Sequence, residues 1–182
     1  MAFDIAIVSH VTRGKLQVGL MVQQTVSQRF GKCLLELSGN NALIIMDDAY
    51  IKLAVRSVLF AAVGTAGQRC TTCRRLLVHE KVYNSVVDQL LEAYKQVKNG
   101  DPLEKGTLLG PLHTRASREN FEKGIKVIKS QTFEEAVEIN NSVPQGFSSS
   151  IFTRSSEIIF KWIGPQGSDC GIVNANIPTN GC

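Results

Sequence analysis

A glycine-bordered loop around Cys70 is the stretch of this chain best suited to chemistry. The loop spans residues 64–73, with the sequence GTAGQRCTTC, between an apolar run at 55–63 and a strand-like run at 74–79. Glycines let the backbone turn sharply, and Arg69 places a permanent cation beside the Cys70 thiol, which favours the nucleophilic thiolate. The alternative is that Cys70 is a small buried apolar residue, a common state of free cysteine.

Glu36 is a second candidate, because a carboxylate can act as a general base. It is flanked by Leu34, Leu35 and Leu37, so we expect it to be partly desolvated. Desolvation raises the pKa of a carboxyl group towards the range in which it removes protons efficiently. The alternative is an ordinary solvated carboxylate on a strand.

A third candidate is the turn that contains Gly14 and Gly19. It follows a strand-like stretch at 3–9 and leads into a helical pattern that extends to residue 30. A turn of this kind directs backbone N–H groups and a helix dipole at a phosphate, as in nucleotide-binding folds. The alternative is an ordinary turn at the start of a helix.

The cysteines do not predict a metal site. The chain contains five of them, an odd number without the dense spacing of a secreted disulfide scaffold, so we expect reduced thiols. Cys70 and Cys73 form a C-x-x-C motif, which is compatible with a redox pair or half of a zinc site. However, the sequence has no second C-x-x-C, and His79 and His113 lie at unsuitable spacings.

Composition indicates a globular protein rather than a disordered one. The 182 residues are 43% hydrophobic, and the net charge of +4 arises from 20 basic and 16 acidic residues scattered along the chain. Without a dense basic block, a nucleic-acid partner is not expected. No apolar run reaches about 18 residues and the N-terminus lacks a basic region before its apolar run, so we expect no membrane span, no signal peptide and a cytoplasmic location.

The elements that must position these residues alternate between strands and helices. This alternation predicts an α/β fold with a mainly parallel sheet flanked by helices, in which 100–111 is a glycine and proline loop. Strands are predicted at 32–37, 42–46, 74–79, 146–153 and 171–176. Helices are predicted from Asp47-Asp48 to residue 63 and at 80–98, 114–129, 132–141 and 155–164.

Four sequence runs together resemble the aldehyde dehydrogenase family, most closely its antiquitin branch. They are LLELSGNN at 34–41, FAAVGTAGQRCTT at 60–72, GSDCGIVN at 167–174 and IPT at 177–179. The resemblance extends over 19–181, although the chain is far shorter than a complete enzyme of that family. It implies a partial fold of the aldehyde dehydrogenase type.

The resemblance also implies the domain organisation. Residues 1–37 would be a remnant of the NAD-binding domain and residues 38–182 the catalytic domain, with the boundary near 37–41. An internal deletion near 130–131 would remove several strands and the glutamate that grips a cofactor ribose. An N-terminal segment with an oxyanion-binding asparagine and an adenosine-binding lysine, and a C-terminal oligomerisation strand, would also be missing.

In chemical terms, the resemblance implies NAD-dependent oxidation of an aldehyde to a carboxylic acid. Cys70 would be the nucleophile, forming a thiohemiacetal and then a thioester, and Glu36 would be the base that activates water. The backbone N–H of Cys70 would supply one donor to the oxyanion. Neither Cys73 nor Cys170 occupies a matching position, so we interpret both as structural.

The cofactor, by the same resemblance, would be NAD. Its contacts would come from Gly14, Lys15, Gly19 and Leu37. Lys15 departs from the family pattern, which has a small hydroxyl residue there, so we expect weakened NAD binding.

Substrate contacts are assigned to Arg69 and Asn176. The family substrate, α-aminoadipate semialdehyde, carries a distal carboxylate that a guanidinium can clamp. Arg69 could instead lower the pKa of the Cys70 thiol or make a local surface pair. Asn176 would support the active-site loop, or else be an asparagine of a strand-end turn.

Two other functions stay open at this point. The chain could be a truncated, catalytically silent family member that associates with full-length subunits or with copies of itself, or a fragment without function. It could also retain the thiol without the cofactor and hydrolyse esters slowly through an acylated Cys70.

Overall fold

The chain forms two compact units, residues 1–39 and residues 40–182. The structure is a computed structural model, which describes residues 5–8, 16–35, 37, 39–112, 114–115, 118–119, 127–144 and 146–181. The division between the units falls within the stretch at 37–41 where the family resemblance places a domain boundary. The roles assigned to the two units stay a prediction.

The first unit is a strand–helix–strand arrangement. Strand β1 (Ile5–Val8) is followed by helix α1 (Leu16–Ser27) and strand β2 (Lys32–Leu35), and the two strands pair in parallel with Ile5 opposite Lys32. Helix α1 also packs closely on Leu37, two residues after the end of β2. A Cβ atom added to Gly19 would lie 2.8 Å from Cδ1 of Leu37, so a larger residue there would require the Leu37 side chain to shift.

The second unit is built on a five-stranded parallel sheet with the order β5-β4-β3-β6-β7. The strands are β3 (Ala42–Ile45), β4 (Arg75–His79), β5 (Val127–Ser130), β6 (Ser148–Phe152) and β7 (Ile172–Ala175). The helices are α2 (Ile51–Val63), α3 (Tyr83–Tyr94), α5 (Phe133–Asn141) and α6 (Ser156–Ile163), with short 3-10 turns η2 (Gly64–Gly67) and η3 (Glu80–Val82). The predicted α/β fold with a parallel sheet flanked by helices is therefore confirmed.

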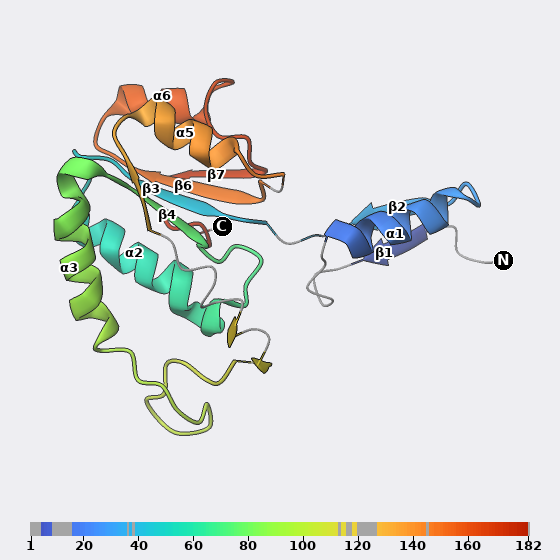
Figure 1. Cartoon of the computed structure of the whole chain (residues 1–182), viewed down its shortest axis with the longest axis horizontal. Coiled ribbons are helices and arrows are strands. Elements are labelled where there is room, and N and C mark those ends of the chain that lie inside the picture. The colour runs from blue at the N-terminus through green and yellow to red at the C-terminus, as the bar shows by residue number, and fades with distance from the viewer. Residues whose placement is uncertain are drawn as a thin grey trace. The chain divides into compact units, whose positions relative to one another are not determined.

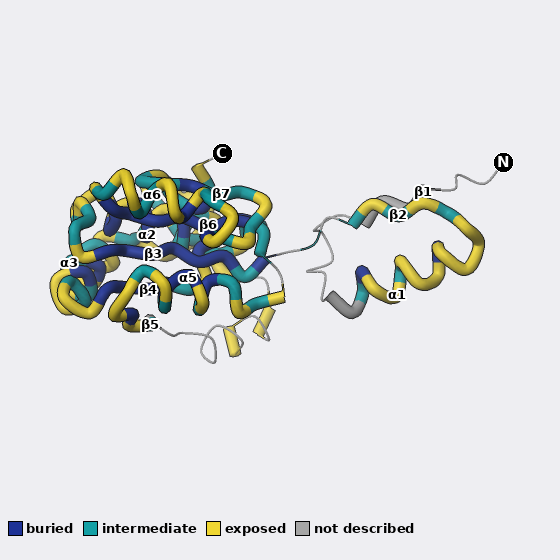
Figure 2. The backbone as a smooth tube through the Cα atoms, turned by 90° about the horizontal axis from the view of Figure 1, so that it is seen from above, coloured by how far each residue is buried: buried dark blue, intermediate teal, exposed yellow. Residues whose placement is uncertain are grey.

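Helices cover both faces of this sheet, with α2 and α3 on one face and α5 and α6 on the other (Figure 1). Successive residues of a strand point to opposite faces, so Leu43 and Ile45 pack towards α2 and α3, whereas Ala42 and Ile44 pack towards α5 and α6. Figure 2 shows β3 buried along its length. This double burial explains why β3 is a continuous apolar run rather than an alternating one.

Local capping sets the starts of α5 and α6. The side chain of Thr132 accepts a hydrogen bond from the Glu135 N–H at 3.1 Å, and Ser155 accepts one from the Ile158 N–H at 3.3 Å. Hydroxyl residues at this position pair one of the free amides of the first turn. Both helices lie within the predicted ranges.

One predicted helix is wrong at its C-terminal end. The helical pattern was extended through Lys129, but residues 127–130 form β5, which pairs with β4 from Leu76 to His79. The β-branched pair Val127-Ile128 suits a strand, and pairing with β4 overrides the local helical spacing.

The helix predicted over 80–98 is shorter than expected. It begins at Tyr83 after η3 and ends at Tyr94. Beyond it, the Lys98 carbonyl accepts hydrogen bonds from the N–H groups of Leu108 and Leu109, at 3.0 and 3.2 Å. The chain therefore leaves the helix to pair with the following loop.

Within the described ranges, no helix has both the length and the apolar character required to cross a bilayer.

Candidate active site

The loop that carries Cys70 connects α2 to β4 and therefore lies at the edge of the sheet where the strands begin. Its first part is conformationally strained: Thr65, Ala66 and Gly67 have φ values of 53°, 51° and 68°. Left-handed backbone is costly for residues other than glycine, so two consecutive non-glycine residues there indicate a conformation imposed by the surroundings. The strained segment ends α2 sharply and redirects the chain towards Cys70.

Cys70 occupies a tight turn. The Arg69 N–H donates to Oγ1 of Thr72 at 3.0 Å, and the Thr72 N–H donates back to the Arg69 carbonyl at 3.2 Å. Cys70 and Thr71 are the two residues enclosed by this pair of bonds. Cys70 is a free thiol and is half-buried. Among the described residues, none accepts a hydrogen bond from the Cys70 N–H, so this amide is free to act as a donor.

The side chain of a buried asparagine holds the turn through hydrogen bonds. Asn41 is 1% exposed, and its Nδ2 donates to the carbonyls of Cys70 at 2.7 Å and Thr72 at 2.9 Å. Its Oδ1 accepts from the Ser148 N–H at 2.9 Å. One side chain therefore joins the Cys70 turn to the starts of β3 and β6.

A second anchor comes from near the end of the described chain. The Thr179 hydroxyl donates to the Thr71 carbonyl at 2.8 Å, and Thr179 is fully buried. Sequence reasoning missed both Asn41 and Thr179. Both lie in runs that carry the family resemblance, but Thr179 is more than one hundred positions from its partner and Asn41 is 29 from Cys70, so no local spacing assigns them a role.

Arg69 stacks on α2. Its Cζ lies 5.0 Å from the centroid of the Phe60 ring, and a Cβ atom added to Gly64 would lie 3.3 Å from Cζ. The guanidinium thus makes a cation–π contact next to the helix C-terminus, where positive charge is favoured. The roles of Arg69 as a substrate clamp or as a modulator of the Cys70 pKa stay predictions.

Asn176 lies at the opposite edge of the sheet, just after β7. Its Oδ1 accepts from the Thr153 N–H at 3.1 Å and its Nδ2 donates to the Thr153 carbonyl at 2.9 Å. Its φ of 58° is typical of an asparagine in a tight turn. Both polar atoms of the side chain therefore serve a strand-end turn, and a substrate contact by Asn176 stays a prediction.

The predicted cofactor residues lie in the first unit. Gly19 is buried in α1 and packs against Leu37, so the structure brings these two together. Gly14 and Lys15 lie outside the described residues, as does the proposed base Glu36.

Among the other described cysteines, Cys73 differs from Cys70 in burial, whereas Cys33 and Cys170 do not. Cys73 is buried, and this burial raises the pKa of its thiol to about 12, so it stays protonated. Cys33 and Cys170 are free and half-buried. Within the described residues, no cluster of three or more His, Cys, Asp or Glu side chains has the proximity needed to hold a metal ion.

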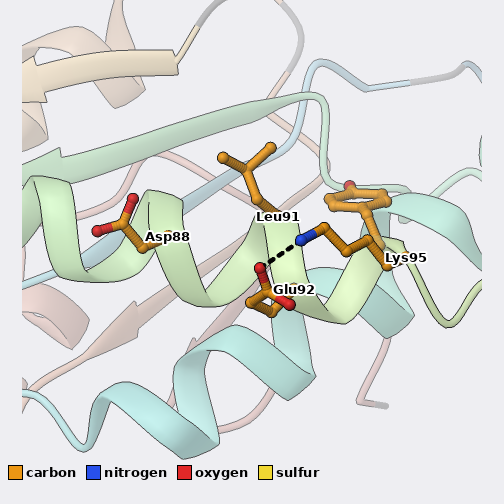
Figure 3. Close-up of a pocket in the computed structure, with 5 residues that line it drawn as sticks. Asp88, Leu91, Glu92 and Lys95 are labelled. Atoms are coloured by element: carbon orange, nitrogen blue, oxygen red, sulfur yellow. Dashed lines mark hydrogen bonds and ion pairs between the residues drawn. The ribbon is translucent and has the colours of Figure 1, made fainter.

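A surface pocket of about 570 Å³ lies along α3 (Figure 3). Its lining includes Asp88, Leu91, Glu92 and Lys95, and Cys70 is not among the lining residues. The Glu92 carboxylate and the Lys95 ammonium lie 2.5 Å apart, and both are well exposed. A solvated ion pair of this kind contributes little specificity, so we do not assign this pocket to the reaction.

The fold and the half-exposed thiol define an α/β protein with a candidate cysteine nucleophile. A sequence model of the aldehyde dehydrogenase family matches residues 3–129. The chain therefore belongs to the aldehyde dehydrogenase family.

Individual relatives support the antiquitin branch. The chain is 63% identical to aldehyde dehydrogenase family 7 member A1 of Brassica napus, in an alignment of 215 positions that covers 92% of this chain and 44% of the relative. It is 45% identical to alpha-aminoadipic semialdehyde dehydrogenase of Mus musculus, with 92% of this chain and 40% of the relative covered. The resemblance drawn from the sequence runs is thus confirmed.

Solved structures agree on the fold. Lactaldehyde dehydrogenase from Escherichia coli superposes with a TM-score of 0.86 at 24% identity, covering 96% of this chain and 46% of that one. A salicylaldehyde dehydrogenase from Pseudomonas putida G7 gives 0.83 at 26% identity, covering 96% and 44%. These likenesses confirm the α/β architecture.

The chain spans less than half the length of these relatives. The Brassica napus alignment has 215 positions, more than the 182 residues of the chain. It must therefore include stretches of the relative that have no counterpart here.

Proposed function

We propose that this chain carries the nucleophile for the NAD-dependent oxidation of an aldehyde to a carboxylic acid, with Cys70 as that nucleophile. The main support is the placement of Cys70 in a hydrogen-bonded turn that leaves its thiol half-exposed and its N–H unpaired among the described residues. Family membership provides the reaction class.

The reaction would begin with the Cys70 thiolate. Its sulfur forms a bond to the aldehyde carbon, and the carbonyl electron pair moves onto oxygen, which creates an oxyanion. The Cys70 N–H is a suitable donor to that oxyanion. Loss of one such donor typically costs about 100- to 1000-fold in rate, so the orientation of this peptide group matters.

Collapse of the oxyanion expels a hydride and leaves a thioester on Cys70. NAD supplies the hydride acceptor when it is bound. Water then attacks the thioester carbon, Glu36 takes the proton from that water, and the Cys70 thiolate leaves as the acid is released. A thiolate is both a good nucleophile and a good leaving group, which suits the attack on the aldehyde and the later release of the acid.

The first unit is the part suited to the cofactor. In a parallel strand–helix–strand unit such as β1–α1–β2, the helix begins beyond the carboxyl end of the first strand, and a helix N-terminus attracts phosphate. Gly14, Lys15, Gly19 and Leu37 would hold the cofactor, with Lys15 meeting the pyrophosphate as a point charge. We propose NAD rather than its 2′-phosphorylated form from the resemblance alone.

The substrate class we propose is a semialdehyde with a distal carboxylate, which the Arg69 guanidinium would bind. One relative is named for alpha-aminoadipic semialdehyde, a substrate of this type. The contact with Phe60 is made by the face of the guanidinium, whereas a carboxylate binds at its N–H edge, so the two contacts are compatible.

NADH formation from aldehyde and NAD tests the proposal directly. We expect Cys70→Ala to lower the rate at least about 1000-fold, since the nucleophile is lost. Cys170→Ala is the matched control, because Cys170 is an equally free and half-buried thiol, and it should retain activity. Equal activity in all three proteins would refute the assignment of Cys70.

A second candidate function is that of a catalytically silent partner of full-length subunits or of copies of itself. It is favoured by one observation, namely that the 215-position alignment with the Brassica napus relative includes stretches that have no counterpart in this chain. Absence of both NADH formation and hydrolysis of an activated aryl ester would favour this partner role. Ester hydrolysis alone would indicate a thiol that works without the cofactor.

A further inference from the structure

Three successive carbonyl groups in the Cys70 turn are each bound by a buried side chain from outside the loop. Asn41 binds the carbonyls of Cys70 and Thr72, and Thr179 binds the carbonyl of Thr71 between them. A carbonyl bond fixes the peptide plane to which it belongs. The three peptide planes that follow the Cys70 Cα atom are therefore all held.

The orientation of the Asn41 amide follows from chemistry. Two of its three neighbours are carbonyl oxygens, which only accept hydrogen bonds, and the third is the Ser148 N–H, which only donates. Nδ2 must therefore face Cys70 and Thr72, and Oδ1 must face Ser148. No side chain of similar size other than asparagine offers two donors and one acceptor in this arrangement.

Apolar packing does little to hold the first part of this loop, although Cys73 at its end belongs to the apolar core. Residues 64–70 are exposed or half-buried, and Thr65 and Ala66 are in left-handed backbone. A strained and poorly buried segment keeps one conformation only if something outside it fixes the chain. Asn41 and Thr179 are the buried side chains that provide this here.

We propose that Asn41, assisted by Thr179, is a positioning residue for Cys70. The peptide planes held after Cys70 include the one that carries the Thr72 N–H, which donates to the Arg69 carbonyl, and that carbonyl shares its peptide plane with the Cys70 N–H. Through these planes, Asn41 and Thr179 set the direction of the thiol and of the Cys70 N–H towards a bound carbonyl group. The inference rests on the proposed function for its catalytic part, whereas the anchoring itself concerns only the conformation of the loop.

The competing explanation is that Asn41 only ties strands together. Its own carbonyl accepts from the N–H groups of Arg74 and Arg75, at 3.0 and 3.1 Å, which joins the start of β3 to β4. Side-chain removal leaves these backbone bonds in place. A variant at position 41 can therefore separate the two explanations.

The experiment compares Asn41→Ala with Asn140→Ala. Asn140 is also 1% exposed in the same unit, but its amide binds Asn141 and Ser168 instead of the Cys70 turn. Two rates are measured for Cys70 by mass spectrometry: acetylation by p-nitrophenyl acetate, which passes through an oxyanion, and alkylation by iodoacetamide, which does not.

Positioning predicts a change in the ratio of these two rates. In Asn41→Ala, acetylation of Cys70 should fall by about 100-fold relative to alkylation, the usual effect of misplacing one oxyanion donor. In Asn140→Ala the ratio should match the wild type, even if the protein is less stable. An unchanged ratio in Asn41→Ala, or an equal change in both variants, would overturn the proposal.

Hydrogen exchange decides the anchoring independently of any chemistry. The Thr72 and Cys73 amides donate to the Arg69 and Ala61 carbonyls, so we expect both to be protected in the wild type. Asn41→Ala should speed their exchange at least about tenfold, and Asn140→Ala should not. If wild-type Cys70 is never acetylated, the proposed function fails, while unchanged exchange in Asn41→Ala would refute the anchoring.

Discussion

The two edges of the five-stranded sheet each depend on an asparagine, but they use it differently. Where the strands begin, Asn41 binds only backbone groups and leaves Cys70 half-exposed. Where the strands end, Asn176 holds Thr153, whose hydroxyl in turn donates to Asp48 at 2.8 Å. The sheet therefore presents a half-exposed thiol where its strands begin, whereas hydrogen-bonded side chains fill the place where its strands end.

This difference departs from the usual pattern in parallel sheets. Ligands generally bind at the carboxyl ends of strands, where the strand order reverses, which here is between β3 and β6. That position is filled by Asp48, which accepts hydrogen bonds from Thr153 and from the Arg154 N–H. In this unit the candidate chemistry therefore lies at the opposite edge, in the connection from α2 to β4.

The largest expected effect is a difference in alkylation rate between Cys70 and Cys73, the two cysteines of the C-x-x-C motif. At about pH 8, a thiol with a pKa of about 12 has roughly 1000-fold less thiolate than an ordinary cysteine. Iodoacetamide should therefore modify Cys70 long before Cys73, as followed by mass spectrometry. The ratio of the two alkylation rates should fall as the pH rises. Equal labelling of all cysteines would mean that no distinct thiol site exists.

The next effect tests whether the two asparagines have separate roles. Asn176→Ala removes two hydrogen bonds to Thr153, so we expect a loss of about 1–3 kcal/mol in the free energy of unfolding, with little change in Cys70 alkylation. Asn176→Gly is the control, because glycine tolerates the left-handed φ and should lose less. A large fall in Cys70 reactivity in Asn176→Ala would show that the two edges are coupled.

Relief of strain in the loop should have a smaller and opposite effect. Ala66 has a φ of 51°, so Ala66→Gly should stabilise the protein by about 0.5–1 kcal/mol in chemical denaturation. Ala62→Gly, within α2, is the matched control and should destabilise by about 1 kcal/mol. Destabilisation by Ala66→Gly would show that the left-handed segment is not strained.

The smallest effect concerns the charged residues that follow β3. A hydrogen bond from Lys81, at 3.1 Å, lowers the pKa of Asp47 below its ordinary value of 3.8. A lowered pKa contributes stability above about pH 4, and this contribution is lost as the pH falls through the folded-state pKa. Both side chains are well exposed, so Asp47→Asn should change stability by less than about 0.5 kcal/mol in acid titrations of unfolding.

Much of this protein follows from local sequence patterns. Apolar runs predict β3 and α2, the predicted ranges 132–141 and 155–164 contain α5 and α6, whose hydroxyl caps are local features, and the glycine-bordered loop identifies Cys70. These features depend on residues close together in the chain, such as a cap and the amide three positions later. A single sequence contains that information directly.

Other features depend on contacts between distant residues. Strand β5 forms at Val127–Ser130 because β4 offers a pairing edge, although the preceding helical spacing indicated a helix. Asn176 serves Thr153 at the far edge of the sheet, a partner that spacing along the chain does not reveal.

The site shows the same division. Residue type and sequence context are sufficient to select Cys70, because a thiol beside a cation in a glycine-bordered loop is recognisable locally. The tertiary structure alone reveals that Asn41 and Thr179 hold its turn, since their partners are 29 to 108 positions away. Buried polar groups must find partners wherever the folded chain brings them, and that requirement determined how the Cys70 turn is held.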